Sequence, residues 1–307
     1  MNDHSAHQDR PLLGILLMLG FCVLAPFGDA IVKLLGPTLT VATFTFYRFG
    51  LQAVFLSGVV LFTTGLPALT RRQYGLIFLR TLCHIAGLST IFMAFRYLPL
   101  ADAVAIAFVV PFIQLLLGKV FLNEQVGKHR LAACTVGFVG TLLVIQPNFA
   151  TAGLAVLWPV ATAWAFAFFV LLGRTIAQEA DPIAIQMVSG WMAVVLMVPA
   201  MVAGAYFGWH EFSFMVPTGQ TLLLVIGAGV LGTLAHLLMT WSLRFAPSAT
   251  LAPLTYIEIP ITVSVGLVVF GDFPNALATL GICVTMAAGL YVVFRERASL
   301  QASQAAS

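Results

Sequence analysis

The sequence predicts an all-α, polytopic membrane protein with ten transmembrane helices, arranged as two inverted repeats of five helices. Three observations lead to this fold class: the composition, the length of the apolar stretches and an internal repeat. Of the 307 residues, 61% are hydrophobic and 8% are charged, whereas a soluble domain carries about 25% charged residues. Because only helices or closed barrels satisfy every backbone polar group in lipid, and the stretches lack strand-like alternation, a helical bundle follows.

Apolar stretches of about 20 residues, each long enough to cross a bilayer as a helix, recur along the whole chain. Gly, Pro and charged residues separate them. We expect spans near 12–35, 41–62, 74–97, 100–121, 130–147, 153–173, 183–206, 221–243, 247–270 and 276–294. This division predicts cytoplasmic tails at 1–11 and 295–307, a first repeat at 12–147 and a second at 153–294.

The basic residues predict the orientation of the chain. Apart from Lys33, Arg48 and Arg96, all Lys and Arg residues fall on the side of a ten-span arrangement that also holds both termini. Because basic residues collect on the cytoplasmic side of membrane proteins, both termini are expected in the cytoplasm. We expect a multi-pass protein of the inner membrane.

The internal repeat appears when the chain is aligned with itself at an offset of 148 residues. This offset places Arg96 on Arg244 and Pro99 on Pro247, within the segments FRYLPLADAV and LRFAPSATLA. Because each half has an odd number of spans, the second half must enter the membrane upside down. Inverted repeats are typical of transporters, which hold their substrate near the midplane between the two halves.

The same offset matches small residues that recur every four positions in the fifth and tenth spans. Such stripes let helix backbones approach closely. They are Ala133, Gly137 and Thr141 in the first half and Gly281, Thr285 and Gly289 in the second.

The repeated FRYLP, FLNE and FGD segments resemble the drug/metabolite transporter superfamily in its EamA type, over nearly the whole chain. The segments GDAIVK, FYRF, LRT, VGFVG, LTYIEI and FGDFPN resemble the subgroup associated with S-adenosylmethionine uptake. The resemblance implies ten helices with both termini inside and a central cavity lined mainly by spans 1, 3, 4, 6, 8 and 9. It also implies a secondary transporter of a small metabolite, such as an amino acid, an amine or an S-adenosylmethionine-like cation.

Glu258 is the first candidate site residue, because charged side chains inside a span are rare and often functional. Thr255 and Thr262 lie three and four residues away and predict a polar stripe on one helix face. Pro253 and Pro260 bracket Glu258, and prolines bend helices and free backbone carbonyls for a cavity. These bends, together with those at Pro26 and Pro111, are candidate flexible points for alternating access.

Two functional roles are open for Glu258. Its carboxyl could gain and lose a proton as substrate binds, which would couple transport to protons. It could instead pair with a cationic substrate, with the ring of Tyr256 or Trp164 supplying a cation–π contact. The alternative is a structural acid that is hydrogen-bonded to neighbouring helices.

Two histidines and a glutamine add weaker signals for substrate binding or proton coupling. His84 lies near the centre of span 3 and His236 in span 8, where an imidazole can donate, accept or carry a proton. Gln114 lies in span 4. An interhelical hydrogen bond is the structural alternative for each. Gln186 is not included, because span 7 is expected to pack outside the cavity.

Asp29 and Arg48 lie at the same predicted depth, ~10 Å from the outer ends of consecutive spans. A lone charge there costs ~2.5–3.5 kcal/mol on insertion scales, so we expect an ion pair. Lys33, one turn beyond Asp29, could extend to the outer surface or compete for it. An extracellular gate is the functional alternative for these three residues.

The other charged residues of the repeat are expected near the membrane interfaces. Solvated anchors and loop caps are the roles we expect for Arg80, Arg96, Arg244, Glu124 and Asp272.

Other functional classes have less support in the sequence. No HExxH, GxSxG, CxxC or P-loop motif is present, so no enzyme, metal site or cofactor is expected. The formal charge of +3 is small and the basic residues are spread over short loops, so no basic face for nucleic acid is expected. A lipid-linked substrate is the first alternative, an intramembrane enzyme or a scaffold is a less favoured one, and a homodimer is left open. The expected partners are therefore a small-molecule substrate, the lipid bilayer and protons as a coupling ion.

Overall fold

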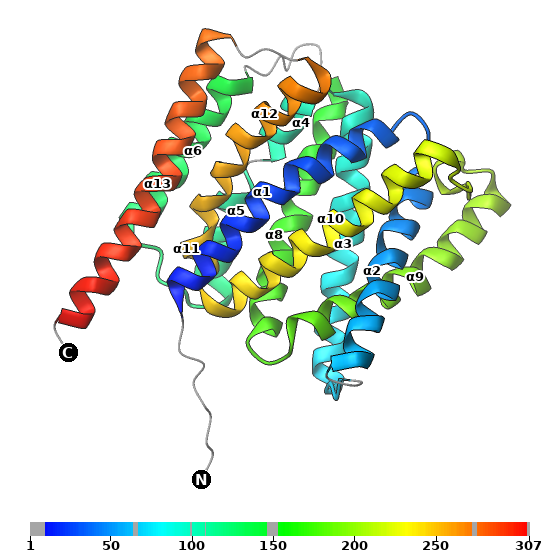
Figure 1. The fold of residues 1–307 in the computed structure, drawn as a ribbon, viewed down its shortest axis with the longest axis horizontal. Helices are drawn as coiled ribbons and strands as arrows, with labels where there is room; N and C mark the ends of the chain where they lie inside the picture. Colours follow the sequence, from blue (N-terminus) through cyan, green and yellow to red (C-terminus); the bar gives the residue numbers. More distant parts are fainter. Residues whose placement is uncertain are drawn as a thin grey trace.

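The computed structural model describes residues 10–63, 67–98, 100–107, 109–145, 153–271 and 275–305. These residues form helices and connecting segments (Figure 1). The α-helices are α1 (Pro11–Leu35), α2 (Val41–Thr63), α3 (Arg71–Tyr97), α4 (Leu100–Ala107), α5 (Val110–Phe121), α6 (Lys128–Ile145), α8 (Leu157–Ala177), α9 (Pro182–Phe207), α10 (Gly219–Phe245), α11 (Ser248–Leu251), α12 (Glu258–Phe270) and α13 (Ala276–Ala305). Three 3-10 helices accompany them: η1 (Gly153–Val156), η2 (His210–Phe212) and η3 (Ala252–Ile257).

Across the described ranges the helices group into the ten predicted spans. The fourth span consists of α4 and α5, the sixth of η1 and α8, and the ninth of α11, η3 and α12. Seven spans are long and apolar enough to cross a membrane by length and composition, and α5 and part of α13 are shorter apolar helices. The predicted fold class, a polytopic helical membrane protein, is confirmed.

The fourth and ninth spans change their helical form at equivalent positions. Helix α5 begins at Val110 and α12 begins at Glu258, which are related by the 148-residue offset of the internal repeat. Pro111 occupies the first turn of α5, while Pro253 lies in η3 and Pro260 in α12. Because proline lacks a backbone N–H and clashes with the preceding turn, it favours such interruptions. Two spans are therefore broken near their middle.

The helices pack in pairs across the bundle. The most extensive contacts are α1 with α10, α3 with α8, α2 with α9, and α6 with α13. Helices α2 and α9 lie at one edge and α6 and α13 at the opposite edge, with the other two pairs between them (Figure 1). The first turn of α1 and the end of α13 lie on the same side of the bundle, which we call the terminal side.

Small residues bring α6 and α13 together at their edge of the bundle. A Cβ atom on Gly140 would lie 3.0 Å from the carbonyl oxygen of Gly281 and 2.8 Å from Cγ2 of Thr285. Helix backbones approach this closely only where side chains are small. Gly281 and Thr285 of the stripe predicted in the tenth span lie at this close contact.

Candidate functional site

A cavity of about 190 Å³ lies among the central helices. Positions 21–32 of α1, 83–95 of α3 and 228–236 of α10 line it, with residues of α2, α4, α5, α8 and the ninth span. These positions place the cavity from the middle of the bundle toward the side away from the termini. It has room for several water molecules or a small organic molecule. The expected spans 1, 3, 4, 6, 8 and 9 all contribute, and α2 is an addition.

The cavity walls are mainly apolar. Aromatic rings from four helices, those of Phe21, Phe44, Phe95 and Phe166, stand between aliphatic side chains. Mostly apolar walls with a few converging polar groups are the usual form of a small-molecule site. The polar groups that interrupt these walls should therefore decide what binds.

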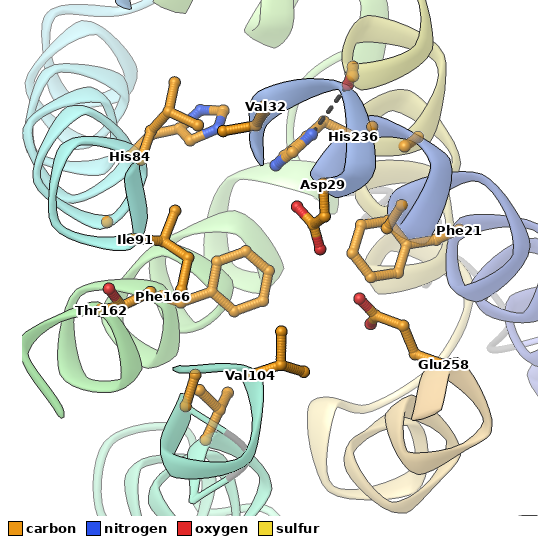
Figure 2. Close-up of a pocket in the computed structure, with 18 of the residues that line it drawn as sticks. Phe21, Asp29, Val32, His84, Ile91, Val104, Thr162, Phe166, His236 and Glu258 are labelled. Atoms are coloured by element: carbon orange, nitrogen blue, oxygen red, sulfur yellow. Dashed lines mark hydrogen bonds between the residues drawn. The ribbon is translucent and has the colours of Figure 1, made fainter. Parts of the chain in front are cut away.

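Two carboxyl groups meet in this cavity. The side chains of Asp29 on α1 and Glu258 on α12 point toward one another (Figure 2). Within the described part of the chain, neither carboxyl group forms an ion pair or a side-chain hydrogen bond. Glu258 is the first residue of α12, where the partial positive charge of a helix N-terminus favours an anion. The site therefore holds two acids without a counter-charge.

Arg48 also lines the cavity, but the predicted ion pair between Asp29 and Arg48 is not formed. The Nη1 atom of Arg48 donates to Oε1 of Gln52 at 3.0 Å and to Oγ1 of Thr233 at 3.5 Å, and Nη2 lies 3.5 Å from Nδ1 of His236. Equal depth on consecutive helices does not fix the direction of two side chains around their axes. Arg48 is turned toward α10, so that its hydrogen-bonding partners are neutral.

His84 and His236 form one end of the cavity, which we call the floor. Their ring centroids are 4.5 Å apart, and the ring of Phe169 lies 4.5 Å from that of His84. His236 donates from Nδ1 to the carbonyl oxygen of Gly232 at 2.8 Å (Figure 2), which leaves its Nε2 as an acceptor when the ring is neutral. The Nδ1 atom of His84 has no hydrogen-bonding partner in the described structure.

Of the two threonines predicted to form a polar stripe with Glu258, only one faces the cavity. Thr255 lines the cavity, whereas Thr262 does not and donates its hydroxyl to the backbone carbonyl of Glu258 at 2.9 Å. Residues three apart are eclipsed in a 3-10 helix, and η3 ends directly before Glu258. This geometry keeps Thr255 on the cavity side of the span.

Four other candidate residues lie away from the cavity walls. Gln114 is buried in α5, and Trp164 is 45% exposed beside Phe168. The Nζ atom of Lys33 stands 4.5 Å from the ring centroid of Phe270. None of these side chains is in a position to contact a molecule in the cavity in this conformation.

Tyr256 is the fourth. It is fully buried and packs against Gly137 of α6, where any Cβ atom would overlap its ring. The small residue in the fifth span therefore accommodates this ring, and the cation–π role predicted for Tyr256 does not fit its position.

Two buried glutamines connect helices behind the cavity wall, of which sequence reasoning missed Gln52 and set Gln186 aside. Gln52 of α2 donates from Nε2 to the backbone carbonyl of Gln186 at 2.7 Å and to its Oε1 at 3.2 Å. Gln186 in turn donates to the carbonyl of His236 and to Oγ1 of Thr240, both at 2.9 Å. The available signal was the polarity of Gln52 and Gln186 inside apolar spans, since such side chains need partners in the membrane.

On the terminal side the bundle is closed by Glu124. Its carboxylate accepts the backbone N–H and the hydroxyl of Ser248, at 3.1 and 2.7 Å, and the N–H of Ala249 at 2.9 Å. Nε of Arg174 lies 3.8 Å from the same carboxylate. Glu124 thus caps α11 and joins the fourth span to the sixth and ninth spans.

On the side of the bundle opposite the terminal side, Arg96 connects two loops. It donates to the carbonyl oxygens of Gly36 and Leu39 and forms an ion pair with Glu211 of η2. Arg96 and Glu124 both lie near the ends of spans, as expected for residues that cap loops.

Comparison with known proteins agrees with this architecture. The model of the EamA-like transporter family matches residues 12–146, a range that nearly coincides with the expected first repeat. A crystal structure aligns with this chain at a TM-score of 0.69 and 14% sequence identity, over 94% of this chain and 97% of the other. That alignment shows a shared fold.

Two named relatives are similar in sequence. A riboflavin transporter of Rhizobium johnstonii is 30% identical over 217 residues, which are 69% of this chain and 65% of that protein, just under two thirds of its length. An S-adenosylmethionine uptake transporter of Rickettsia bellii is 25% identical over 288 residues, which are 94% of this chain and 96% of the relative. Residues 12–146 therefore match the EamA-like transporter family, the type of transporter that the sequence motifs predict.

Proposed function

We propose that this protein is a secondary transporter that moves a small, positively charged organic solute across the inner membrane by alternating access. One observation carries the proposal. Asp29 and Glu258 face each other in the central cavity, and the described structure gives neither carboxyl group a cationic partner (Figure 2). Two carboxylates at close range repel each other, so a cation or a proton is needed between them.

The rest of the cavity suits an organic cation. The rings of Phe21 and Phe166 stand beside the acidic pair (Figure 2) and can bury the apolar part of a solute. Aromatic faces also attract ammonium and sulfonium groups. An amino acid, an amine or an S-adenosylmethionine-like sulfonium compound has both features, and the relative from Rickettsia bellii is named for S-adenosylmethionine uptake.

The arrangement of the helices supports alternating access between two inverted halves. The packing pairs α1 with α10 and α3 with α8 exchange with each other when each span is replaced by its counterpart in the other half, and the pairs α2 with α9 and α6 with α13 map onto themselves. The breaks before Val110 and Glu258 obey the same relation. Transporters of this type rock one repeat against the other around a fixed site.

In this scheme the described conformation faces the outside. The cavity lies in the half of the bundle away from the termini, while Glu124 and its partners close the terminal side. Both termini are cytoplasmic in our proposal, because the basic residues of the sequence favour that orientation.

Protons are the proposed coupling ion, since a carboxyl pair can release a proton when a cation binds. Glu258 and Asp29 would then bind either protons or the solute, but not both. This competition would couple the transport of protons to the transport of the solute. His84 and His236 at the floor are the further candidates for accepting these protons.

Uptake into proteoliposomes tests the proposal. Purified protein would be reconstituted with an inward or outward proton gradient, and S-adenosylmethionine, amino acids and amines would be offered as labelled solutes. We expect Glu258→Gln to lower the uptake of a cationic solute by about tenfold or more, the loss of one charge-assisted contact. Glu179→Gln is the matched control, because Glu179 pairs with Arg72 on the exposed surface.

Unchanged rate and pH dependence in Glu258→Gln would refute the proposed role of this residue. Uptake that is lost in Glu258→Gln but independent of the proton gradient in the wild type would support cation binding without proton coupling.

Riboflavin is the second candidate substrate. The relative named a riboflavin transporter is 30% identical to this chain, and the four phenylalanine rings that line the cavity offer faces for stacking a flat heterocycle. The same proteoliposomes distinguish the two candidates. Uptake of riboflavin that survives Glu258→Gln would favour the flavin over the organic cation.

A further inference from the structure

A chain of buried hydrogen bonds runs from the cavity wall to a second arginine beneath the floor. Nη1 of Arg48 donates to Gln52 at 3.0 Å, Nε2 of Gln52 donates to Oε1 of Gln186 at 3.2 Å, and Nε2 of Gln186 donates to Thr240 at 2.9 Å. Nη2 of Arg80 donates to the same threonine oxygen at 3.1 Å. Every side chain between the two arginines is neutral, so the network supplies no counter-charge to either.

Arg80 is the less satisfied of the two arginines. Its side chain is 0% exposed, although the sequence suggested a solvated anchor at the interface, which is wrong. The guanidinium lies 4.0 Å from the ring centroid of Phe169, and its Nε and Nη1 atoms have no hydrogen-bonding partner in the described structure. No ion pair of the described residues includes Arg80. A buried charge without a charged partner is strongly unfavourable, so the guanidinium group of Arg80 is suited to bind an anion.

The position of Arg80 relates it to the cavity. On α3 the cavity lining ends at Cys83 and His84, and on α10 it ends at His236. Arg80 and Thr240 lie one helical turn beyond these histidines on their respective helices, toward the terminal side. The two histidines therefore separate Arg80 from the cavity. One turn closer to the cavity, the buried Nδ1 atom of His84 also lacks a hydrogen-bonding partner in the described structure.

We propose that Arg80 is an inner anion site that receives a carboxylate group of the transported solute. The inference rests on the proposed function and narrows its substrate class to zwitterions, such as amino acids and their sulfonium derivatives. In the described conformation Asp29 and Glu258 hold the cationic group, and Arg48 is the basic residue on the cavity wall. When the floor opens toward the terminal side, the carboxylate reaches Arg80, whose free N–H groups and charge-assisted bonds stabilise it.

This proposal explains why an arginine is present at a position where an apolar residue would be more favourable. Replacement of buried charges by apolar residues of similar volume is often neutral or stabilising. An arginine that serves transport should therefore lower the stability of the resting protein. An arginine that serves packing alone should raise it.

The test combines stability with two matched solutes. Arg80→Met keeps an unbranched side chain of similar volume and removes the charge, and Arg80→Lys keeps the charge. Arg72→Met is the control, because Arg72 is an exposed arginine on the same helix. The melting temperature of each purified full-length variant is measured without solute. Uptake into proteoliposomes is then measured for S-adenosylmethionine and its decarboxylated analogue, and for several amino acids with the corresponding amines.

We expect Arg80→Met to have an unchanged or higher melting temperature than the wild type. It should take up the carboxylate-bearing solutes about tenfold more slowly and the decarboxylated analogues within about twofold of the wild-type rate. Arg80→Lys should recover part of the difference, since lysine can pair with a carboxylate as a point charge.

Two results would overturn the inner anion site. One is a lower melting temperature for Arg80→Met, and the other is an equal loss of uptake for both members of each solute pair. Failure of the proposed function looks different, because the wild-type protein would then take up neither member of any pair.

Discussion

The carboxyl group of Asp29 on α1 points at that of Glu258 on α12 across the cavity, and no described side chain neutralises either group (Figure 2). The first helix belongs to one expected repeat and the other helix to the second. When both acids are ionised, the electrostatic repulsion between them therefore acts between the two halves of the protein, and it disappears when a cation or a proton enters.

Removal of one of these acids should stabilise the protein without solute. In Asp29→Asn the like-charge repulsion is lost, and we expect the melting temperature in detergent to rise, by roughly 2–4 °C for each kcal/mol gained. Asp181→Asn is the matched control, because Asp181 caps α9 by accepting backbone N–H groups and asparagine caps equally well. A decrease in the melting temperature of Asp29→Asn would show that Asp29 has a stabilising partner.

The cap of α11 should contribute strongly to stability on the terminal side. Glu124→Ala removes three hydrogen bonds to Ser248 and Ala249 and leaves buried donors unsatisfied, so a loss of about 1–3 kcal/mol or more is expected. Ser248→Ala removes only the hydroxyl contact and should cost less. Thermal unfolding of both variants measures the difference, and equal losses would contradict the role given to the backbone N–H groups.

The contact between Gly137 and Tyr256 gives a prediction about packing. Gly137→Ala places a methyl group inside the volume of the tyrosine ring, and overpacking of this kind typically costs about 1–3 kcal/mol. Tyr256→Leu should restore part of the loss in the double variant. Gly75→Ala is the control, because no atom lies within 4 Å of its added Cβ. If the double variant is no more stable than Gly137→Ala, the steric explanation fails.

The loop ion pair between Arg96 and Glu211 predicts a pH dependence. Partial burial alone would raise the pKa of Glu211, but the hydrogen bond and charge of Arg96, with smaller contributions from Val41 and His210, hold that pKa below its usual value. Because the pKa is lower in the folded state, the stability that Glu211 contributes is complete above the unfolded pKa of about 4.3. It is lost as the pH falls through the lower folded value.

We therefore expect Glu211→Gln to have a lower melting temperature than the wild type at neutral pH, with the difference shrinking as the pH falls below about 4.3. Glu179→Gln should show little difference at any pH, because its ion pair with Arg72 is exposed. A difference for Glu211→Gln that persists at low pH would mean that packing, and not charge, stabilises this loop.

The sequence predicted the helices well, because hydropathy and the length of a span are direct consequences of the bilayer. It also identified polar residues that the structure brings to the cavity: Glu258, Asp29, Arg48, His84, His236 and Thr255. Their roles in binding or coupling stay predictions. The reason for this success is that a polar side chain inside a span is costly, so such residues gather where water or solute can reach them.

Depth alone did not predict which way a side chain points. Asp29 and Arg48 lie at similar depth yet form no ion pair, and Tyr256 follows Thr255 directly but faces α6 instead of the cavity. The 3-10 turn before Glu258 changes the angular spacing of residues, which no regular helical pattern anticipates. Arg80 was missed for a related reason, because a position near a predicted span end says nothing about the neighbouring helices that cover it.

Glu258 is the residue at which the ninth span changes from a 3-10 helix to an α-helix, with a proline on either side. Its carboxyl group lies in the cavity where we propose that the solute binds, and its backbone forms the joint of the span. A charge that binds at this side chain therefore acts directly on the joint. Binding of the solute and bending of the ninth span can then be coupled through one residue, without a chain of intermediate residues.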